Sequence, residues 1–266
     1  MTHLLPVYRT LLRISLAEQL QYRVANAIWM LGLVLEPLVF LVVWSTVARG
    51  EGGSVAGFGP RDFAAYYIAL LFVNHLTFSW VMHEFEFFIQ SGQLSFRLLR
   101  PIHPIHGDLA DNLAYKALML ALLVPAAAAL AFAFEPRFPL GPGLLLVLPA
   151  LALGFALRFL FEWTLALAAF WTTRVTALNQ IYFAVLMFMS GRVAPLPLLP
   201  DGLRAAADAL PFYWMIGFPV ELAVGRVPEG RVLAGFAAQG AWIAAGAGLL
   251  ALVWRRAVRR HAAVGQ

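Results

Sequence analysis

Charged and polar side chains interrupt the long apolar segments of this chain, and such residues bind or relay ions inside membranes. The five that stand deepest in apolar sequence are Glu36, Asn74, His75, Arg158 and Glu162. A charge at that depth costs roughly 3 kcal/mol on insertion scales, so it must pair or face water. Arg158 and Glu162 are four residues apart, which places them on one helix face. We interpret them as a structural ion pair.

Glu36 and His75 have no obvious partner in the sequence. Glu36 either pairs with Arg158 across the bundle or lines a polar path, and the adjacent Pro37 frees a carbonyl that kinks the helix or serves a cavity. Asn74 most often signals a hydrogen bond between helices. His75 is of the type that relays protons. An ion-coupled secondary transporter that uses Glu36 or His75 therefore stays open as an alternative function.

The chain has no phosphate-binding loop of its own. Such a loop needs a lysine between glycine and serine or threonine, because the lysine and the backbone amides hold the nucleotide phosphates. Lys116 is the only lysine, and its neighbours are Tyr115 and Ala117. We expect no catalytic residue here, and any ATP and Mg²⁺ must be bound by another polypeptide.

A metal site is not expected either. His103, His106 and Asp108 have a spacing that superficially resembles metal ligands. Pro104 prevents a regular helix from presenting both imidazole rings together. The chain contains no cysteine, which removes thiolate sites and disulfides.

The elements that position these residues are membrane spans. The chain is 62% hydrophobic and only 12% charged, whereas soluble domains are about half apolar and about a quarter charged. A span takes about 20 apolar residues. Six segments qualify, the fifth being short: residues 24–47, 64–89, 113–134, 144–171, 178–193 and 233–254. We predict an all-α polytopic membrane protein with a six-span domain over residues 24–254.

The basic residues predict the orientation. With the N-terminus inside, the outer basic residues are fewer and are offset by acidic ones, Glu221 among them, as the positive-inside rule requires. The outer basic residues are Arg49, Arg61, Arg137, Arg192, Arg204, Arg226 and Arg231. The cytoplasmic basic residues are then Arg9, Arg13, Arg23, Arg97, Arg100, Lys116, Arg174, Arg255, Arg256, Arg259 and Arg260. Both termini are predicted to be cytoplasmic. The net charge of +5 is concentrated in the tail, residues 255–266, beside a membrane exit, which favours anionic lipid over nucleic acid.

Two further regions flank the spans. Residues 1–23 carry leucines and Tyr8 at helical spacing with Arg9 and Arg13 on another face. That pattern predicts an amphipathic interface helix, either a plain anchor or a surface that also touches a cytoplasmic partner. Residues 195–225 are rich in proline and aromatic residues, which predicts short helices that dip into the outer leaflet, with Asp201 capping one of them.

The loop after the second span, residues 90–106, is the most distinctive one. Its first residues break the preceding helix, and Pro101 stops any short helix that forms in it. Between these points four apolar side chains are clustered beside two arginines, so a short amphipathic helix is expected to dock into a partner's groove rather than to be solvated. Its expected contact residues are Ser91, Gly92, Gln93, Leu94, Phe96, Arg97, Leu98, Leu99, Arg100 and Pro101.

Together these features resemble the membrane subunits of type-2 ABC exporters, in particular the small six-span permeases often encoded as pairs beside one ATPase. The likeness of layout covers nearly the whole chain, and the best local match is residues 92–101. The resemblance implies a dimer of permeases on a cytoplasmic ABC ATPase dimer, in the cytoplasmic membrane of a prokaryote. It also implies that the 90–106 loop is the coupling helix. The family exports drugs, lipids and polysaccharides, so it does not supply the substrate.

Overall fold

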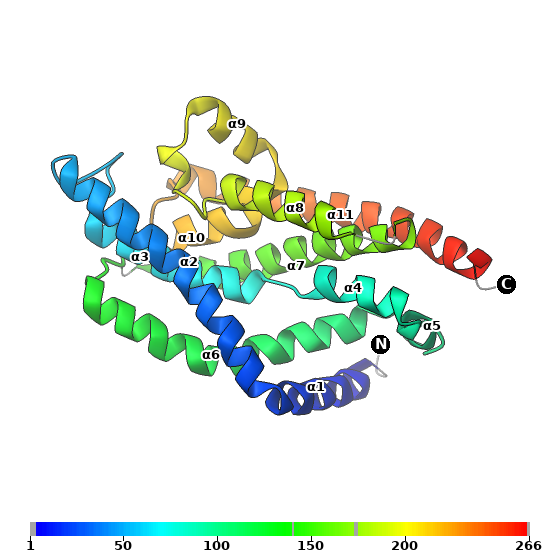
Figure 1. Cartoon of the computed structure of the whole chain (residues 1–266). Helices are drawn as coiled ribbons and strands as arrows, with labels where there is room; N and C mark the ends of the chain where they lie inside the picture. Colours follow the sequence, from blue (N-terminus) through cyan, green and yellow to red (C-terminus); the bar gives the residue numbers. More distant parts are fainter. Residues whose placement is uncertain (1–3, 140, 173–174, 265–266) are drawn as a thin grey trace.

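The computed structural model of this chain is built from helices and describes residues 4–139, 141–172 and 175–264 (Figure 1). Arg174, one of the cations assigned to the cytoplasmic side, lies outside the described residues. The elements in chain order, with η1 to η3 being 3-10 helices and η4 a π-helix, are α1 Leu4–Gln21, α2 Arg23–Gly50, α3 Pro60–Thr77, α4 Val81–Gln90, α5 Gln93–Leu98, α6 Ile105–Phe134, η1 Pro142–Leu146, α7 Val147–Ala166, η2 Leu167–Phe170, α8 Thr176–Met189, η3 Leu196–Leu198, α9 Asp201–Ala209, η4 Tyr213–Gly217, α10 Phe218–Ala223 and α11 Glu229–Val264.

Five stretches of the described chain are long and apolar enough to cross a membrane. They are Arg23–Gly50, Pro60–Gln90, Ile105–Phe134, Gly143–Phe170 and Glu229–Arg260. The segment predicted as the fifth span, residues 178–193, contains α8, which has 14 residues. At 1.5 Å per residue α8 is about 21 Å long, short of a hydrocarbon core of about 30 Å. The structure therefore supports a multi-pass helical membrane protein without fixing a sixth complete span.

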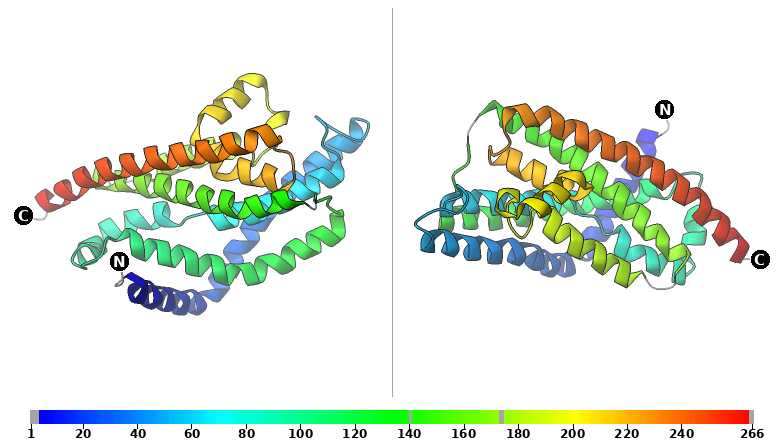
Figure 2. Two further views of the ribbon diagram at one scale, coloured as in Figure 1. Left: turned by 180° about the vertical axis from the view of Figure 1, so that it is seen from behind. Right: turned by 90° about the horizontal axis from the view of Figure 1, so that it is seen from above.

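α3 lies at the centre of the bundle, where 13 of its 18 residues are buried and ten of those are hydrophobic. It packs against α2, α6 and α7, and α7 packs in turn against α11 (Figure 2). Two tyrosines of α3 fix the turn after α8: the Tyr66 hydroxyl donates to the carbonyl of Gly191 and the Tyr67 hydroxyl to that of Val193, each at 2.8 Å. Gly191 has a φ of +84°, and a Cβ there would lie 2.5 Å from the Tyr66 hydroxyl oxygen, so only glycine fits.

The second predicted span is not one helix. It ends as α3 at Thr77 and resumes as α4 at Val81, so Phe78, Ser79 and Trp80 break it inside the membrane-spanning stretch. No glycine or proline marks this break in the sequence. The Thr77 hydroxyl donates to the carbonyl of Val73 at 2.8 Å, a local bond of the kind that competes with the helix ladder.

The N-terminal helix α1 lies along the first half of α6 (Figure 1). The Tyr8 hydroxyl and His106 Nδ1 are 2.7 Å apart, and the Ser15 hydroxyl donates to the carboxylate of Asp111. Leu5, Leu16 and Leu20 stay exposed on α1. α1 therefore has one face that is tied to the bundle by polar contacts and another that is apolar and uncovered.

Both termini and α5 lie at one end of the bundle, and the helices of residues 195–225 lie towards the other end (Figures 1 and 2). Asp201 is the first residue of α9 and makes no capping bond, so the expected cap is wrong. It instead pairs with Arg204 at 3.1 Å. The basic tail is not a separate segment either, because α11 continues without a break to Val264; the last two residues lie outside the described part.

Candidate functional site

A fully buried ion pair occupies the middle of α7. Arg158 Nε donates to Glu162 Oε1 at 2.7 Å, and neither side chain has any exposed surface. Arg158 Nη1 reaches across to α3, where it donates to Asn74 Oδ1 at 3.0 Å and to the Thr77 hydroxyl at 3.1 Å. From α8, the Tyr182 hydroxyl donates to Glu162 Oε1 at 3.3 Å. This polar cluster fastens α3, α7 and α8 together beside the α3–α4 break, where the Arg158 guanidinium also lies over the Phe78 ring.

Lys116 was assigned to the cytoplasmic cations, and the structure corrects this. Its side chain is 5% exposed, inside α6. Lys116 Nζ donates to the carbonyl of Phe78 at 2.6 Å and to Asn112 Oδ1 at 3.3 Å. The carbonyl belongs to the α3–α4 break, so the lysine satisfies a backbone acceptor that the interrupted helix leaves free.

Glu36 pairs with Arg192, and not with Arg158. Arg192 Nη2 and Nε donate to the two carboxylate oxygens of Glu36 at 2.6 and 3.1 Å, which is the bidentate geometry of a strong pair. Arg192 was placed in an outer segment from the sequence. Because α8 ends early at Met189, Arg192 lies beside the middle of α2 instead. α2 is a continuous helix through Pro37.

The Glu36–Arg192 pair lies in a groove between α2, the α3–α4 break and α8. A cavity of about 370 Å³ there is lined by Glu36 and Arg192 together with Asn74, Phe78 and His83. A second, mostly apolar cavity of about 410 Å³ shares Phe78 and His83 and is also lined by Trp29 and Trp80. The groove is thus mostly aromatic and apolar, and its polar groups are the Glu36–Arg192 pair, Asn74 and His83.

His75 does not reach that groove. It is almost fully buried between α3 and α6, and its Nε2 lies 3.3 Å from the carbonyl of Lys116. Its ring packs against Tyr115, and its other nitrogen, Nδ1, has no hydrogen-bond partner. Within the described chain no carboxylate contacts His75, so the matched acid that a proton relay needs is not adjacent to it.

The loop of residues 90–106 forms α5 at the end of the bundle where the termini lie (Figure 1). Gly92 precedes the helix with a φ of +73°, and Ser91 ends α4. Phe96 and Leu99 are 72% and 81% exposed. Gln93, Ser91, Arg100 and Pro101 are also exposed, and Leu98 is half-buried.

Two of the expected contact residues of this loop face inward instead. Leu94 is fully buried. Arg97 donates to the carboxylate of Asp108 at the start of α6, and Asp108 accepts a second bond from Trp163 Nε1 of α7 at 2.8 Å. The Arg97 guanidinium lies 4.6 Å from the Phe88 ring centre of α4. These contacts anchor α5 to α4, α6 and α7, so only its outer face is left for another molecule.

The histidines near this loop point to different partners. His106 contacts Tyr8 of α1, and His103 packs against Trp163 and Trp254. Burial, with a smaller contribution from His106, lowers the pKa of His103. Among the described residues no group of three or more histidine, aspartate or glutamate side chains is placed to hold a metal ion.

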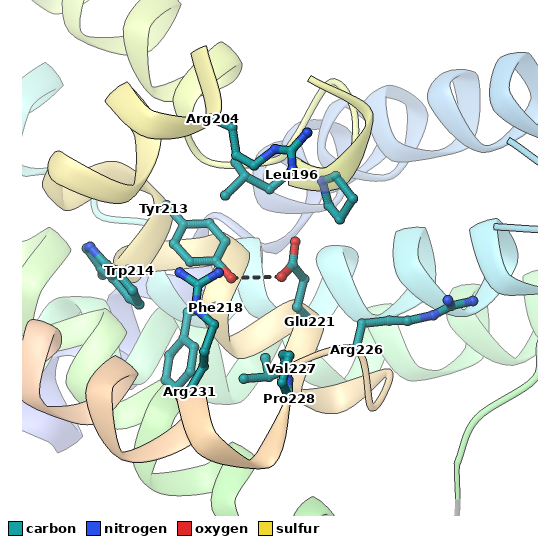
Figure 3. A pocket seen from close by; sticks show the side chains of 11 residues that line it. Leu196, Arg204, Tyr213, Trp214, Phe218, Glu221, Arg226, Val227, Pro228 and Arg231 are labelled. Carbon is teal, nitrogen blue, oxygen red and sulfur yellow. Dashed lines mark hydrogen bonds between the residues drawn. The ribbon is translucent and has the colours of Figure 1, made fainter. Parts of the chain in front are cut away.

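A further pocket, of about 180 Å³, lies among the helices of residues 195–225 and the start of α11 (Figure 3). These helices lie towards the end of the bundle opposite the termini (Figure 1). Its central group is Glu221 of α10, whose Oε2 accepts a bond from the Tyr213 hydroxyl at 2.7 Å. Burial raises the pKa of Glu221 to about 7, against the opposing effects of the Tyr213 bond and of Arg231. Sequence reasoning placed Glu221 among the outer charges and did not identify this pocket.

Sequence reasoning also missed the roles of Lys116, Asp108 and Arg192. Lys116 and Asp108 stand inside or at the edge of an apolar segment, and that position is the signal of a buried polar contact. The partner of Arg192 depends on where α8 ends, and residue spacing carries no such information.

The comparisons with known proteins gave one match. The family model described as ABC-2 family transporter protein matches residues 33–265. Neither the search of curated proteins nor that of solved structures found a match.

Proposed function

This chain belongs to the ABC-2 transporter family, and we propose that it is the permease subunit of an exporter whose ATP is hydrolysed by a separate, cytoplasmic ABC ATPase dimer. The match spans most of the chain, and permeases of this family are in general non-enzymatic membrane components. ATP and Mg²⁺ belong to the partner in this proposal. Both termini and α5 are then cytoplasmic, in the cytoplasmic membrane of a prokaryote.

The observation that carries the proposal is the exposure of Phe96 on α5 and of Leu99, the residue that follows α5. The other face of this six-residue helix is held by Leu94 and by the Arg97–Asp108 pair. Large apolar side chains on a rigid protrusion contribute most when they fill a partner's pocket. Arg100, exposed beside them, supplies a charge for the rim of such an interface.

A movement of α5 can be transmitted to the groove through the single helix α4. α5 follows α4 after two residues, and α4 begins at the break of residues 78–80. α4 has ten residues, so α5 lies about 15 Å along this helix from the break. The break borders the cavity of Glu36 and Arg192. We infer that closure of the ATPase tilts α4 about the break and changes the groove, which is how one site shifts the conformational equilibrium of another.

The lining of the groove also supports two further parts of the proposal, which are the chemical class of the substrate and the presence of a second permease subunit. Its walls are apolar and aromatic with one ion pair, which suits an amphiphilic compound of the drug-like or lipidic kind. α2 exposes Trp29, Leu35, Val39 and Val43 along its length. A second permease, identical or different, packed on this apolar face would enclose the groove between the two subunits.

Single cysteines in α5 and directly after it test the coupling, because the native chain has none. Cysteines at Phe96 and at Leu99 are expected to crosslink to a co-expressed ATPase, whereas a cysteine at the buried Leu94 is the matched control that should not. Phe96→Ala should weaken ATPase binding by about tenfold or more, as loss of an aromatic anchor does. If neither exposed position crosslinks and Phe96→Ala binds the ATPase normally, α5 is not the docking element.

The same co-expression separates an ATP-driven exporter from the ion-coupled alternative. Transport that needs the ATPase and persists when the proton gradient is collapsed supports the proposal. Transport without any ATPase, abolished by collapsing the gradient, would favour a carrier that uses Glu36 or His75. The pairing of Glu36 with Arg192 neutralises the first of these groups in the state described here.

A further inference from the structure

The pocket at the end opposite the termini contains a buried carboxylate with an unused oxygen. Glu221 is 6% exposed. The Tyr213 hydroxyl satisfies its Oε2, but its Oε1 has no hydrogen-bond partner. The backbone N–H of Leu196 is near the carboxylate, though not in bonding geometry to Oε1. A buried acceptor without a donor lowers the stability of the fold, unless a bound molecule or water donates a hydrogen bond to it.

Three arginines line the same pocket, yet each pairs with a different acid. Arg204 pairs with Asp201 at 3.1 Å, Arg231 with Asp208 at 3.1 Å and Arg226 with Asp62 at 3.3 Å. No described cation lies within 4.0 Å of the Glu221 carboxylate.

Arg204 contributes an unused donor, because its Nε is buried without a partner. Figure 3 shows Arg204 of α9 above the Tyr213–Glu221 bond and Arg231 of α11 beside Tyr213 in that view. The pocket therefore holds an unsatisfied anionic acceptor and an unsatisfied cationic donor that do not bond to each other.

The rest of the lining is aromatic. The rings of Tyr213, Trp214 and Phe218 border the pocket. Aromatic faces beside a carboxylate attract an ammonium group, and guanidinium groups bind phosphate or carboxylate oxygens. A simple anion would be repelled by Glu221 and a simple cation by Arg204. A zwitterion with an ammonium and an anionic group a few bonds apart satisfies both.

A mostly apolar groove adjoins this pocket through Val227, which lines both cavities. The groove has a volume of about 550 Å³ and is lined by Leu146, Leu222, Leu233 and Phe236, with Glu229 as its one charged side chain. Leu222 and Glu221 are consecutive on α10, so one helix contributes the polar group to the pocket and an apolar group to the groove. Leu146 and Leu233 are exposed where η1 ends and α11 begins, so the groove has uncovered apolar side chains at the starts of two membrane-spanning stretches.

We propose that this pocket and groove bind a zwitterionic phospholipid. The ammonium of its headgroup bonds Glu221 Oε1 among the aromatic rings, its phosphate bonds Arg204 and Arg231, and an acyl chain lies along Val227, Leu233 and Phe236. The apolar groove favours a lipid over a free zwitterion of the same polar chemistry. This site is distinct from the α2–α8 groove and does not depend on the transport proposal.

Native mass spectrometry of the detergent-purified protein tests the site. The probes are a phosphatidylethanolamine, a phosphatidylglycerol with the same acyl chains, and free phosphoethanolamine. Phosphatidylethanolamine should be retained about tenfold better than phosphatidylglycerol, the factor that one charge-assisted hydrogen bond gives. Glu221→Gln should abolish that preference, and Glu51→Gln, the same charge change at an exposed residue at this end of the bundle, should keep it.

Two results would overturn the proposal. Equal retention of the two lipids by the wild-type protein would mean unselective annular lipid. Binding of free phosphoethanolamine as tight as that of the lipid would show that the groove contributes nothing and that a soluble zwitterion is the ligand. If Glu221→Gln fails to fold, Arg204→Gln is the second variant, and it should lower the retention of both lipids. The comparison of the two lipids on the wild-type protein tests the proposal without either variant.

Discussion

Lys116 Nζ of α6 donates to the carbonyl oxygen of Phe78 at 2.6 Å, so the only lysine in the chain bonds the residue at which the second membrane-spanning stretch is interrupted. The bond connects α6 to the point about which α4 would tilt. It gives the break a defined geometry, because a carbonyl freed inside a membrane needs a donor.

Replacing this lysine should destabilise the protein without changing its insertion. Lys116→Met keeps the length of the side chain but leaves the Phe78 carbonyl without its donor, at a cost of about 1–3 kcal/mol. We expect a lower midpoint of thermal unfolding in detergent. Arg137→Met, at an exposed position, is the control. A Lys116→Met protein that melts at the wild-type temperature would show that the bond is dispensable.

Removing one partner of the Arg158–Glu162 pair should cost more than removing both. Arg158→Met leaves the Glu162 carboxylate buried with only Tyr182 as a donor, so a loss of about 3–5 kcal/mol is expected. The double variant Arg158→Met with Glu162→Leu buries no charge and should recover part of that loss. Unfolding midpoints of the single and double variants measure the difference. Additive losses would contradict this account.

Glu36 and Arg192 should be exchangeable as a pair. Glu36→Gln removes the charge opposite Arg192, so it should impair transport or assembly while the chain still inserts. The exchange of Glu36→Arg with Arg192→Glu restores an ion pair and should recover activity in part. Substrate efflux from cells provides the measurement, with membrane fractionation as the check on insertion. Full transport by Glu36→Gln would remove the pair from the mechanism.

Stability in lipid-stripped protein should depend on pH through Glu221. Burial raises the pKa of Glu221 to about 7 from its usual 4.5, so between these values the folded protein binds the proton that the unfolded chain has released. The stability from this group is present below about pH 4.5 and is lost as the pH rises to about 7, at about 1.4 kcal/mol per pH unit.

The matched variant for this titration is Glu221→Gln, which cannot titrate. The wild-type unfolding midpoint should fall between about pH 5 and about pH 8 by more than that of Glu221→Gln. The other charged groups that face Glu221 are Arg204, Arg226, Arg231 and Asp208, and they are unchanged in this variant. Parallel pH profiles for the two proteins would show that Glu221 is not the titrating group.

The sequence by itself determined the class of the protein and the residues that matter locally. Long apolar runs specify membrane helices because unpaired backbone groups are not tolerated in hydrocarbon, and the spacing of Arg158 and Glu162 placed them on one face of α7. The glycine and proline around residues 92–101 marked a short helix between two spans. The family resemblance drawn from this layout agrees with the family match over residues 33–265.

Only the tertiary structure decided which distant groups meet. The break at residues 78–80 carries no glycine or proline. Its polar groups are instead satisfied from other helices, because Lys116 donates to the Phe78 carbonyl and Arg158 donates to the Thr77 hydroxyl. Glu36 pairs with Arg192 because α8 ends early, and Arg97 of α5 faces Asp108 because α6 begins beside it. Pairings of this kind depend on helix ends and packing distances, which the order of residues along one helix does not contain.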